Sequence, residues 1–238
     1  MSGIPEDIEI VFEDAHLVAL VKPAGLPTAN APAGAPSVYA WLKRRLGRGA
    51  FVGVVSRLDA PVSGLVVMAK TPRAAAALAA QFRERSVDKA YAAVVGGRFP
   101  APCGAWVDWH DRIDRRAGDR RSVRCSAAAA DAAEGTPGLP AHVRARVVRR
   151  SGEVSLVDLE PSTGRRHQLR LQLAARGCPI VGDRRYGSRL PFPDGIALHA
   201  ARLALDHPAS RDRLEVAIPH PPAWRREFAG LLSRTDQG

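Results

Sequence analysis

Residues 55–71 read VSRLDAPVSGLVVMAKT, and this stretch joins a polar turn to an apolar run. Asp59 stands two positions after Arg57 and shortly before the Ser63-Gly64 pair. The run from Leu65 to Ala69 predicts a buried strand. A carboxylate at the mouth of such a strand, next to a fixed positive charge, stays ionised and can act as a nucleophile or base. The same pattern also occurs as a surface ion pair at a turn, so this stretch alone leaves both interpretations open.

A second stretch, residues 160–187, reads EPSTGRRHQLRLQLAARGCPIVGDRRYG. It favours the interpretation of Asp59 as a reactive carboxylate over that of a surface ion pair. Four ordered motifs can be read along the chain: Arg57-Leu58-Asp59 with Ser63-Gly64; Lys89 and Tyr91; Thr163-Gly164-Arg165 with His167-Gln168-Leu169-Arg170; and Gly177, Pro179-Ile180, Gly182-Asp183 and Tyr186-Gly187. Together they resemble the RluA-like family of pseudouridine synthases. Residues 13–28, EDAHLVALVKPAGLPT, resemble the opening segment of that family, so the resemblance covers about residues 8–220. Several ordered motifs are much harder to meet by chance than one.

The resemblance implies an RNA pseudouridine synthase, an isomerase that detaches a uracil base, turns it and rejoins it through C5. It implies that Asp59 is the catalytic carboxylate, that Tyr91 packs against the target base, and that Arg170 pairs with Asp59. On the residues alone, Tyr91 would be interpreted as a core or edge-strand tyrosine, and the alternative for Arg170 is a helix-surface arginine. Whether Asp59 attacks the sugar carbon or removes a sugar proton stays open. The reaction needs no redox change or group transfer, so we expect no cofactor and no metal.

Basic residues around these motifs are predicted to contact RNA. Arg57 would fill the gap left by an extruded nucleotide or hold a phosphate. Arg165, Arg166 and His167 are predicted phosphate contacts, with a buried structural role as the alternative for His167. Two residues depart from the family pattern, since Ser56 replaces a histidine and Val62 a threonine. These departures bear on substrate choice more than on the chemistry.

The composition agrees with a nucleic-acid partner. The formal net charge of the 238 residues is +11, which attracts a polyanion. Aromatic residues are only 5%, which argues against a stacking platform for single strands. The cysteines Cys103, Cys125 and Cys178 show neither a disulfide framework nor zinc-ligand spacing. No signal peptide or membrane-spanning run is visible, and we expect a cytoplasmic protein without a membrane contact.

The pattern of apolar residues predicts an α+β fold, a mainly antiparallel mixed sheet with flanking helices. Strands are expected at about 8–12, 16–22, 64–70, 88–96, 142–149, 153–159, 200–206 and 213–218, and helices at 37–47, 72–86, 167–176 and 222–233. We expect one catalytic domain over residues 1–238, without an N-terminal accessory RNA-binding domain. A flexible insertion is expected near 113–141, because residues 110–124 are rich in Asp and Arg and residues 126–140 are low in complexity.

Other functions remain to be weighed. A non-catalytic RNA- or ribosome-binding protein could retain the same fold, but it need not keep Asp59, Tyr91 and Arg170 together. A hydrolase acting through Ser63 or Asp59 lacks a G-x-S-x-G elbow. A metalloenzyme would need histidines at ligand spacing, which the sequence does not show. The predicted partner is tRNA, rRNA or both, and no obligatory protein partner is inferred.

Overall fold

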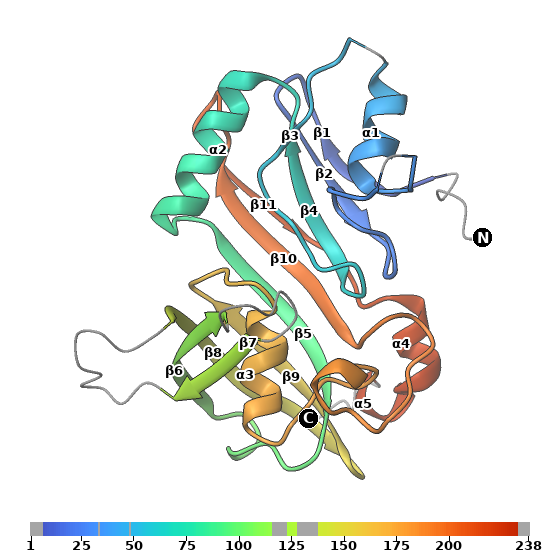
Figure 1. Ribbon diagram of the computed structural model, residues 1–238, viewed down its shortest axis with the longest axis vertical. Helices are drawn as coiled ribbons and strands as arrows, with labels where there is room; N and C mark the ends of the chain where they lie inside the picture. Colours follow the sequence, from blue (N-terminus) through green and yellow to red (C-terminus); the bar gives the residue numbers. More distant parts are fainter. Residues whose placement is uncertain (1–6, 33, 48, 116–122, 128–137, 233–238) are drawn as a thin grey trace, which may run out of the picture. The chain divides into compact units, whose positions relative to one another are not determined.

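The computed structural model describes residues 7–32, 34–47, 49–115, 123–127 and 138–232. The chain forms two compact units. The first comprises Met1–Lys89 and His199–Pro219, and the second Ala90–Leu198 and His220–Gly238. Both units contain strands of one 11-stranded sheet, and each unit is described in turn (Figure 1).

The strands of the first unit pair mostly in antiparallel fashion, and one pairing is parallel. β1 pairs with β2, β2 with β4, β3 with β4 and β10 with β11 in antiparallel fashion, whereas β4 and β10 run parallel. The bounds are β1 (Ile10–Glu13), β2 (Leu17–Lys22), β3 (Gly53–Val54), β4 (Ser63–Ala69), β10 (Leu198–Asp206) and β11 (Arg213–Ala217). The predicted apolar strand at 64–70 is therefore confirmed as β4.

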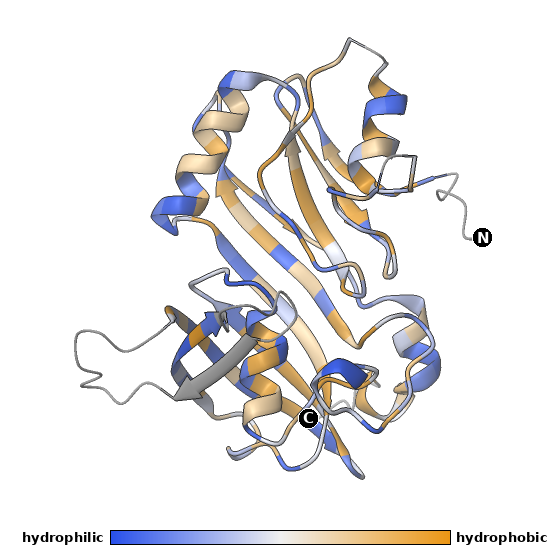
Figure 2. Cartoon of the chain, in the orientation of Figure 1, coloured by the Kyte–Doolittle hydropathy of each residue, from blue (hydrophilic) through white to orange (hydrophobic). Residues whose placement is uncertain are grey.

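β4 lies at the centre of this unit and is buried along its whole length, and it is hydrophobic through most of that length (Figure 2). Successive side chains of a strand point to opposite faces. Leu65 and Val67 accordingly belong to one apolar cluster with helix α2 (Pro72–Glu84), and Val66 and Met68 to another with helix α1 (Val38–Leu46). One helix thus packs on each face of the strand.

Helix α2 begins where the sequence predicts. The Thr71 hydroxyl accepts a hydrogen bond from the Ala74 N–H at 3.1 Å, and Pro72 occupies the first turn. A threonine cap satisfies an amide that has no partner within the helix, and proline costs nothing at that position. This cap fixes the helix directly after β4.

The second unit is an antiparallel sheet in the order β5-β9-β8-β6-β7. Its strands are β5 (Asp88–Gly96), β6 (Trp106–Arg115), β7 (Val123–Ala127), β8 (Leu139–Ser151) and β9 (Val154–Pro161), and its helices are α3 (Gln168–Ala175), the 3-10 turn η1 (Arg184–Tyr186), α4 (Pro222–Glu227) and α5 (Ala229–Leu232). Leu171 of α3 packs on Ile113 and Ala141, which places this helix on the sheet. The predicted α+β fold with mainly antiparallel strands is confirmed.

No strand was predicted at the Asp- and Arg-rich residues 110–124, but those that the structure describes lie in β6 and β7. β6 continues to Arg115 and β7 starts at Val123. Trp109, Asp111 and Ile113 are buried in alternation, as in a half-buried strand. Asp111 hides this pattern in the sequence, because a buried acid interrupts the apolar periodicity. Of the expected insertion near 113–141, residues 116–122 and 128–137 lie outside the described part.

The helix predicted at 222–233 is interrupted in the structure. α4 ends at Glu227 and α5 runs from Ala229 to Leu232. Phe228, between them, leaves helical geometry and stacks on Phe192, with ring centroids 5.5 Å apart. Tertiary packing therefore overrides the local helical pattern. In the part of the chain that the structure describes, no helix is both long and apolar enough to cross a membrane.

Candidate active site

Asp59 lies in the segment between β3 and β4, and its neighbours are fixed through their main chain. The Thr28 hydroxyl donates to the Leu58 carbonyl at 3.0 Å and accepts from the Leu58 N–H at 3.1 Å. The Val62 N–H closes a turn on the Asp59 carbonyl at 3.0 Å. Asp59 is half-buried and Arg57 is exposed. The segment is thus held by hydrogen bonds that use backbone groups on either side of the carboxylate.

A buried lysine lies beneath this segment. The Lys22 ammonium donates to the carbonyls of Pro23, Leu26 and Ala60 at 2.8, 2.7 and 3.0 Å, and its side chain is fully buried. The Gly25 N–H donates to the same Ala60 carbonyl at 2.8 Å. Three acceptors match the three protons of an ammonium group. Ala60, the residue after Asp59, is therefore tied to the end of β2.

Burial lowers the pKa of Lys22 from its usual 10.5 to about 7, and the negative charge of Asp59 acts in the opposite direction. The two charged groups are therefore electrostatic neighbours. Lys22 lies in residues 13–28, the segment that resembles the opening of the family, and no role was predicted for it from the sequence. Lysine is rarely buried without partners, so its place in an apolar strand next to a Pro-Ala-Gly turn was the available signal.

The start of β4 is held by two further side chains. Ser63 and the Nδ1 atom of His199 are hydrogen-bonded at 2.8 Å in the interior. Ser56 accepts from the Val67 N–H at 2.8 Å and donates to the Val67 carbonyl at 3.1 Å. Ser56, the departure from the family pattern, thus attaches the Asp59 segment to the edge of β4. His199 of β10 thus holds the first residue of β4.

Gly64 permits a close approach between β4 and β10. It has a φ of +119°, and a Cβ there would lie 2.4 Å from the Ala200 carbonyl oxygen. Only glycine combines this backbone conformation with the absence of a side chain. The glycine after Ser63 is therefore required by the parallel pairing that follows Asp59.

Arg170, on α3 in the second unit, forms a bidentate ion pair. Its Nε donates to Asp183 Oδ2 at 2.7 Å and its NH2 to Asp183 Oδ1 at 2.9 Å. The side chains are 6% and 2% exposed, so a full charge pair lies in the interior. A guanidinium fork and a carboxylate fit each other in this arrangement. The pairing of Arg170 with Asp59 stays a prediction.

Asp183 is the partner that sequence reasoning missed. The sequence suggests that it forms a turn, and it does, since its carbonyl accepts from the N–H groups of Tyr186 and Ser188 at 3.0 and 3.1 Å. Its carboxylate, however, also orients Arg170. An aspartate that follows a glycine in a turn is read from sequence as a turn former. Nothing local shows that the side chain points inward.

His167 and Tyr186 join the start of α3 to η1. The His167 Nδ1 and the Tyr186 hydroxyl are 2.6 Å apart, and the Arg170 guanidinium lies 5.0 Å from the centroid of the Tyr186 ring. Burial raises the pKa of Tyr186, so its hydroxyl keeps its proton, and the tautomer of His167 decides which of the two groups donates. This contact fits the structural alternative for His167, whose contact with RNA stays a prediction.

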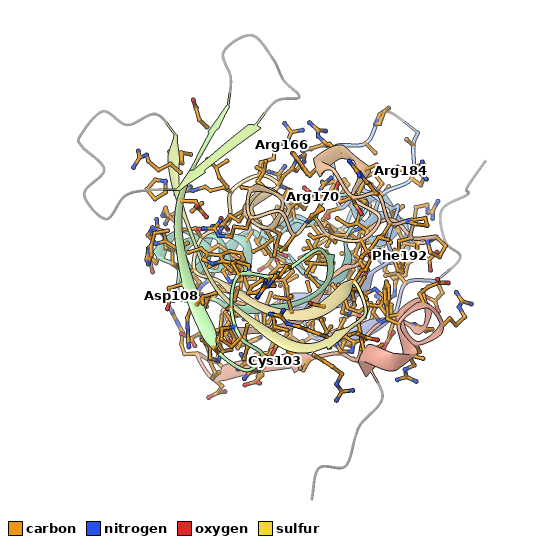
Figure 3. All side chains as sticks on the ribbon, turned by 90° about the horizontal axis from the view of Figure 1, so that it is seen from below. Cys103, Asp108, Arg166, Arg170, Arg184 and Phe192 are labelled. Atoms are coloured by element: carbon orange, nitrogen blue, oxygen red, sulfur yellow. The ribbon has the colours of Figure 1, made fainter. Side chains whose placement is uncertain are left out.

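The loop before α3 is closed by Gln168. Its Oε1 accepts from the Thr163 hydroxyl at 2.7 Å and from the Arg165 N–H at 3.0 Å. The Arg165 Nε donates to the Pro140 carbonyl at 2.9 Å, whereas Arg166 is exposed. In Figure 3, Arg166 lies toward the outside and Arg170 deeper in the same unit. Of the two arginines in this loop that are predicted to contact phosphate, Arg165 and Arg166, Arg166 is thus the more accessible.

Tyr91 lies on β5, opposite Leu159 of β9, and is half-buried. Asp59 belongs to the first unit, and Tyr91 and Arg170 to the second. The joint action of these three residues stays a prediction. Within the described ranges, no group of three or more His, Cys, Asp or Glu side chains is arranged to hold a metal ion.

Comparisons with known proteins agree with this geometry. The family model described as RNA pseudouridylate synthase matches residues 16–175. The chain is 35% identical over 222 residues to the dual-specificity RNA pseudouridine synthase RluA of Vibrio vulnificus, across 89% of this chain and 82% of that protein. The chain belongs to the RluA-like family of RNA pseudouridine synthases.

Further members of this family support the assignment. The ribosomal large subunit pseudouridine synthase D of Xanthomonas campestris pv. campestris is 35% identical over 248 residues, covering 95% of this chain and 71% of that protein. The structure of human RNA pseudouridylate synthase domain containing 4 superposes with a TM-score of 0.74 at 25% identity, covering 94% of this chain and 92% of that one. Human RNA pseudouridylate synthase domain containing 1 gives 0.73 at 27% identity, covering 92% and 86%.

Membership of the RluA-like family makes the chain an intramolecular isomerase that acts on RNA. The prediction of a pseudouridine synthase, made from the ordered motifs, is confirmed. The comparisons place the chain among enzymes, and not among RNA-binding proteins that keep only the fold.

Proposed function

We propose that the enzyme isomerises specific uridines in tRNA or in large-subunit rRNA and that Asp59 is its catalytic carboxylate. The observation that carries this proposal is the fixation of the main chain on both sides of Asp59, by Thr28 at Leu58 and by Lys22 at Ala60. A reacting group must be held within a fraction of an ångström of its productive position. The relatives are named as a dual-specificity RNA pseudouridine synthase and as a ribosomal large subunit pseudouridine synthase, which supports these two substrate classes.

The proposed reaction rearranges one nucleotide without adding or removing atoms. The bond between N1 of uracil and C1′ of ribose breaks, and a bond between C5 and C1′ forms. A proton leaves C5 and a proton is gained at N1, so product and substrate are isomers. Asp59 acts as an anion in this scheme, either on the sugar carbon or on a sugar proton. Both routes require the loop that holds Asp59 to position its carboxylate precisely.

The other predicted residues have roles around this carboxylate. We propose that Tyr91 packs against the target base and that Arg170 pairs with Asp59. Asp183 accepts from two of the five guanidinium N–H donors of Arg170, which sets the direction of the remaining three. Arg57, Arg165, Arg166 and His167 are proposed to contact the RNA. No cofactor is proposed, and a cytoplasmic location stays the prediction made from the sequence.

Mapping of pseudouridines across all RNAs tests this proposal. A strain that lacks the gene should lose one or a few pseudouridines, and their position in tRNA or large-subunit rRNA names the target. The wild-type gene should restore them, and a gene carrying Asp59→Asn should not. Restoration by Asp59→Asn would contradict the assignment of the carboxylate. No lost site in the deletion strain would contradict the proposed substrates.

A further inference from the structure

A cavity of about 470 Å³ lies between the start of α1 and the chain segment that precedes this helix, within the first unit. Its walls are mostly small and apolar, and its polar side chains are those of Asn30, Ser37 and Tyr39. Tyr39 is 36% exposed, so part of its side chain is open to solvent. The volume falls within the range of roughly 300–1,000 Å³ that is typical of sites for small organic groups.

This cavity is joined to the Asp59 segment through one residue, Thr28. The hydroxyl of Thr28 holds Leu58, and its carbonyl accepts from the Tyr39 N–H at 3.0 Å. Val54 also lines the cavity, and it belongs to β3, the strand that leads into the Asp59 segment. A group bound in the cavity is therefore close to the segment that carries the proposed catalytic carboxylate.

The first amides of α1 are already bonded, which decides what kind of group the cavity suits. The N–H groups of Val38, Tyr39 and Ala40 donate to the Pro27 carbonyl, the Thr28 carbonyl and the Ser37 hydroxyl at 3.0, 3.0 and 3.1 Å. These amides would otherwise attract an anion to the start of a helix. The cavity instead offers an aromatic ring and the amide of Asn30, which carries both donors and an acceptor. A planar, uncharged group with polar edges fits this set.

Positive charge follows one turn further along α1. Ala40 lines the cavity, and Arg44, four residues later, lies on the same side of the helix about 6 Å further along and is exposed. Arg45 pairs with Glu13 at 2.9 Å, whereas within the described ranges Arg44 forms no ion pair. A site for a planar group thus lies beside a guanidinium that can bind an anion. A base and a phosphate, the two parts of a nucleotide, have these properties.

We propose that this cavity binds one unpaired nucleotide of the substrate RNA close to the target uridine, with its base stacked on Tyr39 and its phosphate bound by Arg44. The Asn30 amide hydrogen-bonds the edge of that base. The inference rests on RNA being the substrate, but not on the role of Asp59. One aromatic ring serves one base, which agrees with an aromatic content too low for a stacking platform. The site supplies affinity and register and takes no part in bond making or breaking.

Binding of a labelled oligouridine of about 20 nucleotides at several salt concentrations tests the proposal, because stacking on an aromatic ring accepts any base. Tyr39→Ala should weaken binding about tenfold without changing the slope of log affinity against log salt, since stacking releases no counterions. Tyr39→Phe keeps the ring and should bind like the wild type. Arg44→Gln should make the slope shallower by about 0.7. Asn30→Gly keeps the left-handed backbone, removes the amide and should weaken binding about threefold.

The matched control is Phe51→Ala, because Phe51 is 40% exposed and does not line the cavity. Tyr39→Ala that binds like the wild type or like Phe51→Ala would overturn the proposal, and so would a loss of affinity with a shallower slope. Equal melting temperatures of the variants show that loss of binding does not reflect unfolding. A wild-type protein that does not bind the oligouridine would contradict the proposed function as well. A failure confined to Tyr39→Ala leaves that function intact, and turnover by Asp59→Asn tests it separately.

Discussion

The segment that carries Asp59 and the segment that carries Arg170 are held in opposite ways. Around Asp59, other side chains bind the backbone, as Thr28 does at Leu58 and Lys22 does at Ala60. At Arg170, the functional side chain itself is bound, by the carboxylate of Asp183. The first arrangement fixes where a carboxylate stands. The second fixes which way a guanidinium points.

The difference agrees with what each group is proposed to do. A group that forms or breaks bonds must be positioned precisely, and anchors on the backbone at both sides of it contribute to this. A group that orients another needs its direction set, which a bidentate ion pair provides. The two regions can be tested separately, because for each of them the chain contains a similar contact away from the site that can serve as a control.

Among the variants that break these contacts, the largest expected effect follows from Asp183→Asn. It removes the charged half of the buried bidentate pair with Arg170, which costs about 3–5 kcal/mol of unfolding free energy. Turnover per folded molecule should fall at least about tenfold, since the guanidinium loses its orientation. Urea unfolding and single-turnover tritium release from C5-labelled RNA measure the two effects.

The control for this variant is Asp111→Asn. Asp111 is 1% exposed and bonds Arg176 and Gln172, so its loss also leaves buried partners unsatisfied. It should destabilise the protein and spare turnover per folded molecule. Equal losses of turnover in the two variants would mean that Asp183 acts only through stability. Arg170→Lys should likewise reduce turnover strongly, whereas Arg166→Lys should be mild.

Replacement of Lys22 by methionine should have the next largest effect. The substitution removes the ammonium donor from the carbonyls of Pro23, Leu26 and Ala60, which costs about 2–4 kcal/mol. Loosening of Ala60 should also lower turnover. Lys70→Met is the control, because Lys70 bonds Glu13 and the Asp14 carbonyl and none of the backbone next to Asp59.

The pH dependence of stability gives a separate test of Lys22. Its pKa is about 7 in the folded protein and near 10.5 when exposed. Between these values the unfolded chain binds one more proton, so the contribution of Lys22 to stability rises with pH from about 7 to about 10.5 and is lowest below pH 7. Urea unfolding should therefore show a larger gap between wild type and Lys22→Met at pH 9 than at pH 6.5. A difference in unfolding free energy that shrinks from pH 6.5 to pH 9 would show that Lys22 does not release its proton in the folded protein.

The smallest expected effect is that of Thr28→Val. The change keeps the shape of the side chain and removes both hydrogen bonds to Leu58, at a cost of about 1–2 kcal/mol. Thr71→Val removes the cap of α2 at a similar cost of about 1 kcal/mol. Only Thr28→Val should reduce turnover in the tritium assay. Equal turnover in the two variants would show that the Leu58 anchor does not position Asp59.

Much of the fold and part of the site could be predicted from the sequence. The apolar run of β4, the Thr71-Pro72 start of α2 and the ordered motifs around Asp59 and Arg170 carry local signals, and the family follows from them. β6 was missed because the buried Asp111 interrupts its apolar pattern. Lys22 and Asp183 were missed because their burial depends on tertiary contacts, with Ala60 and with Arg170. No local rule therefore separates them from an exposed lysine and a turn aspartate.

Tritium release by purified Asp59→Asn tests the central claim most directly. Asparagine keeps the shape of the side chain but cannot act as an anion, and the Thr28 and Lys22 anchors of the backbone do not involve the carboxylate. The account predicts no release from C5-tritiated RNA at saturating enzyme, with wild-type melting temperature and RNA affinity. Release at the wild-type rate would contradict it, and the catalytic group would then have to be sought elsewhere in the chain.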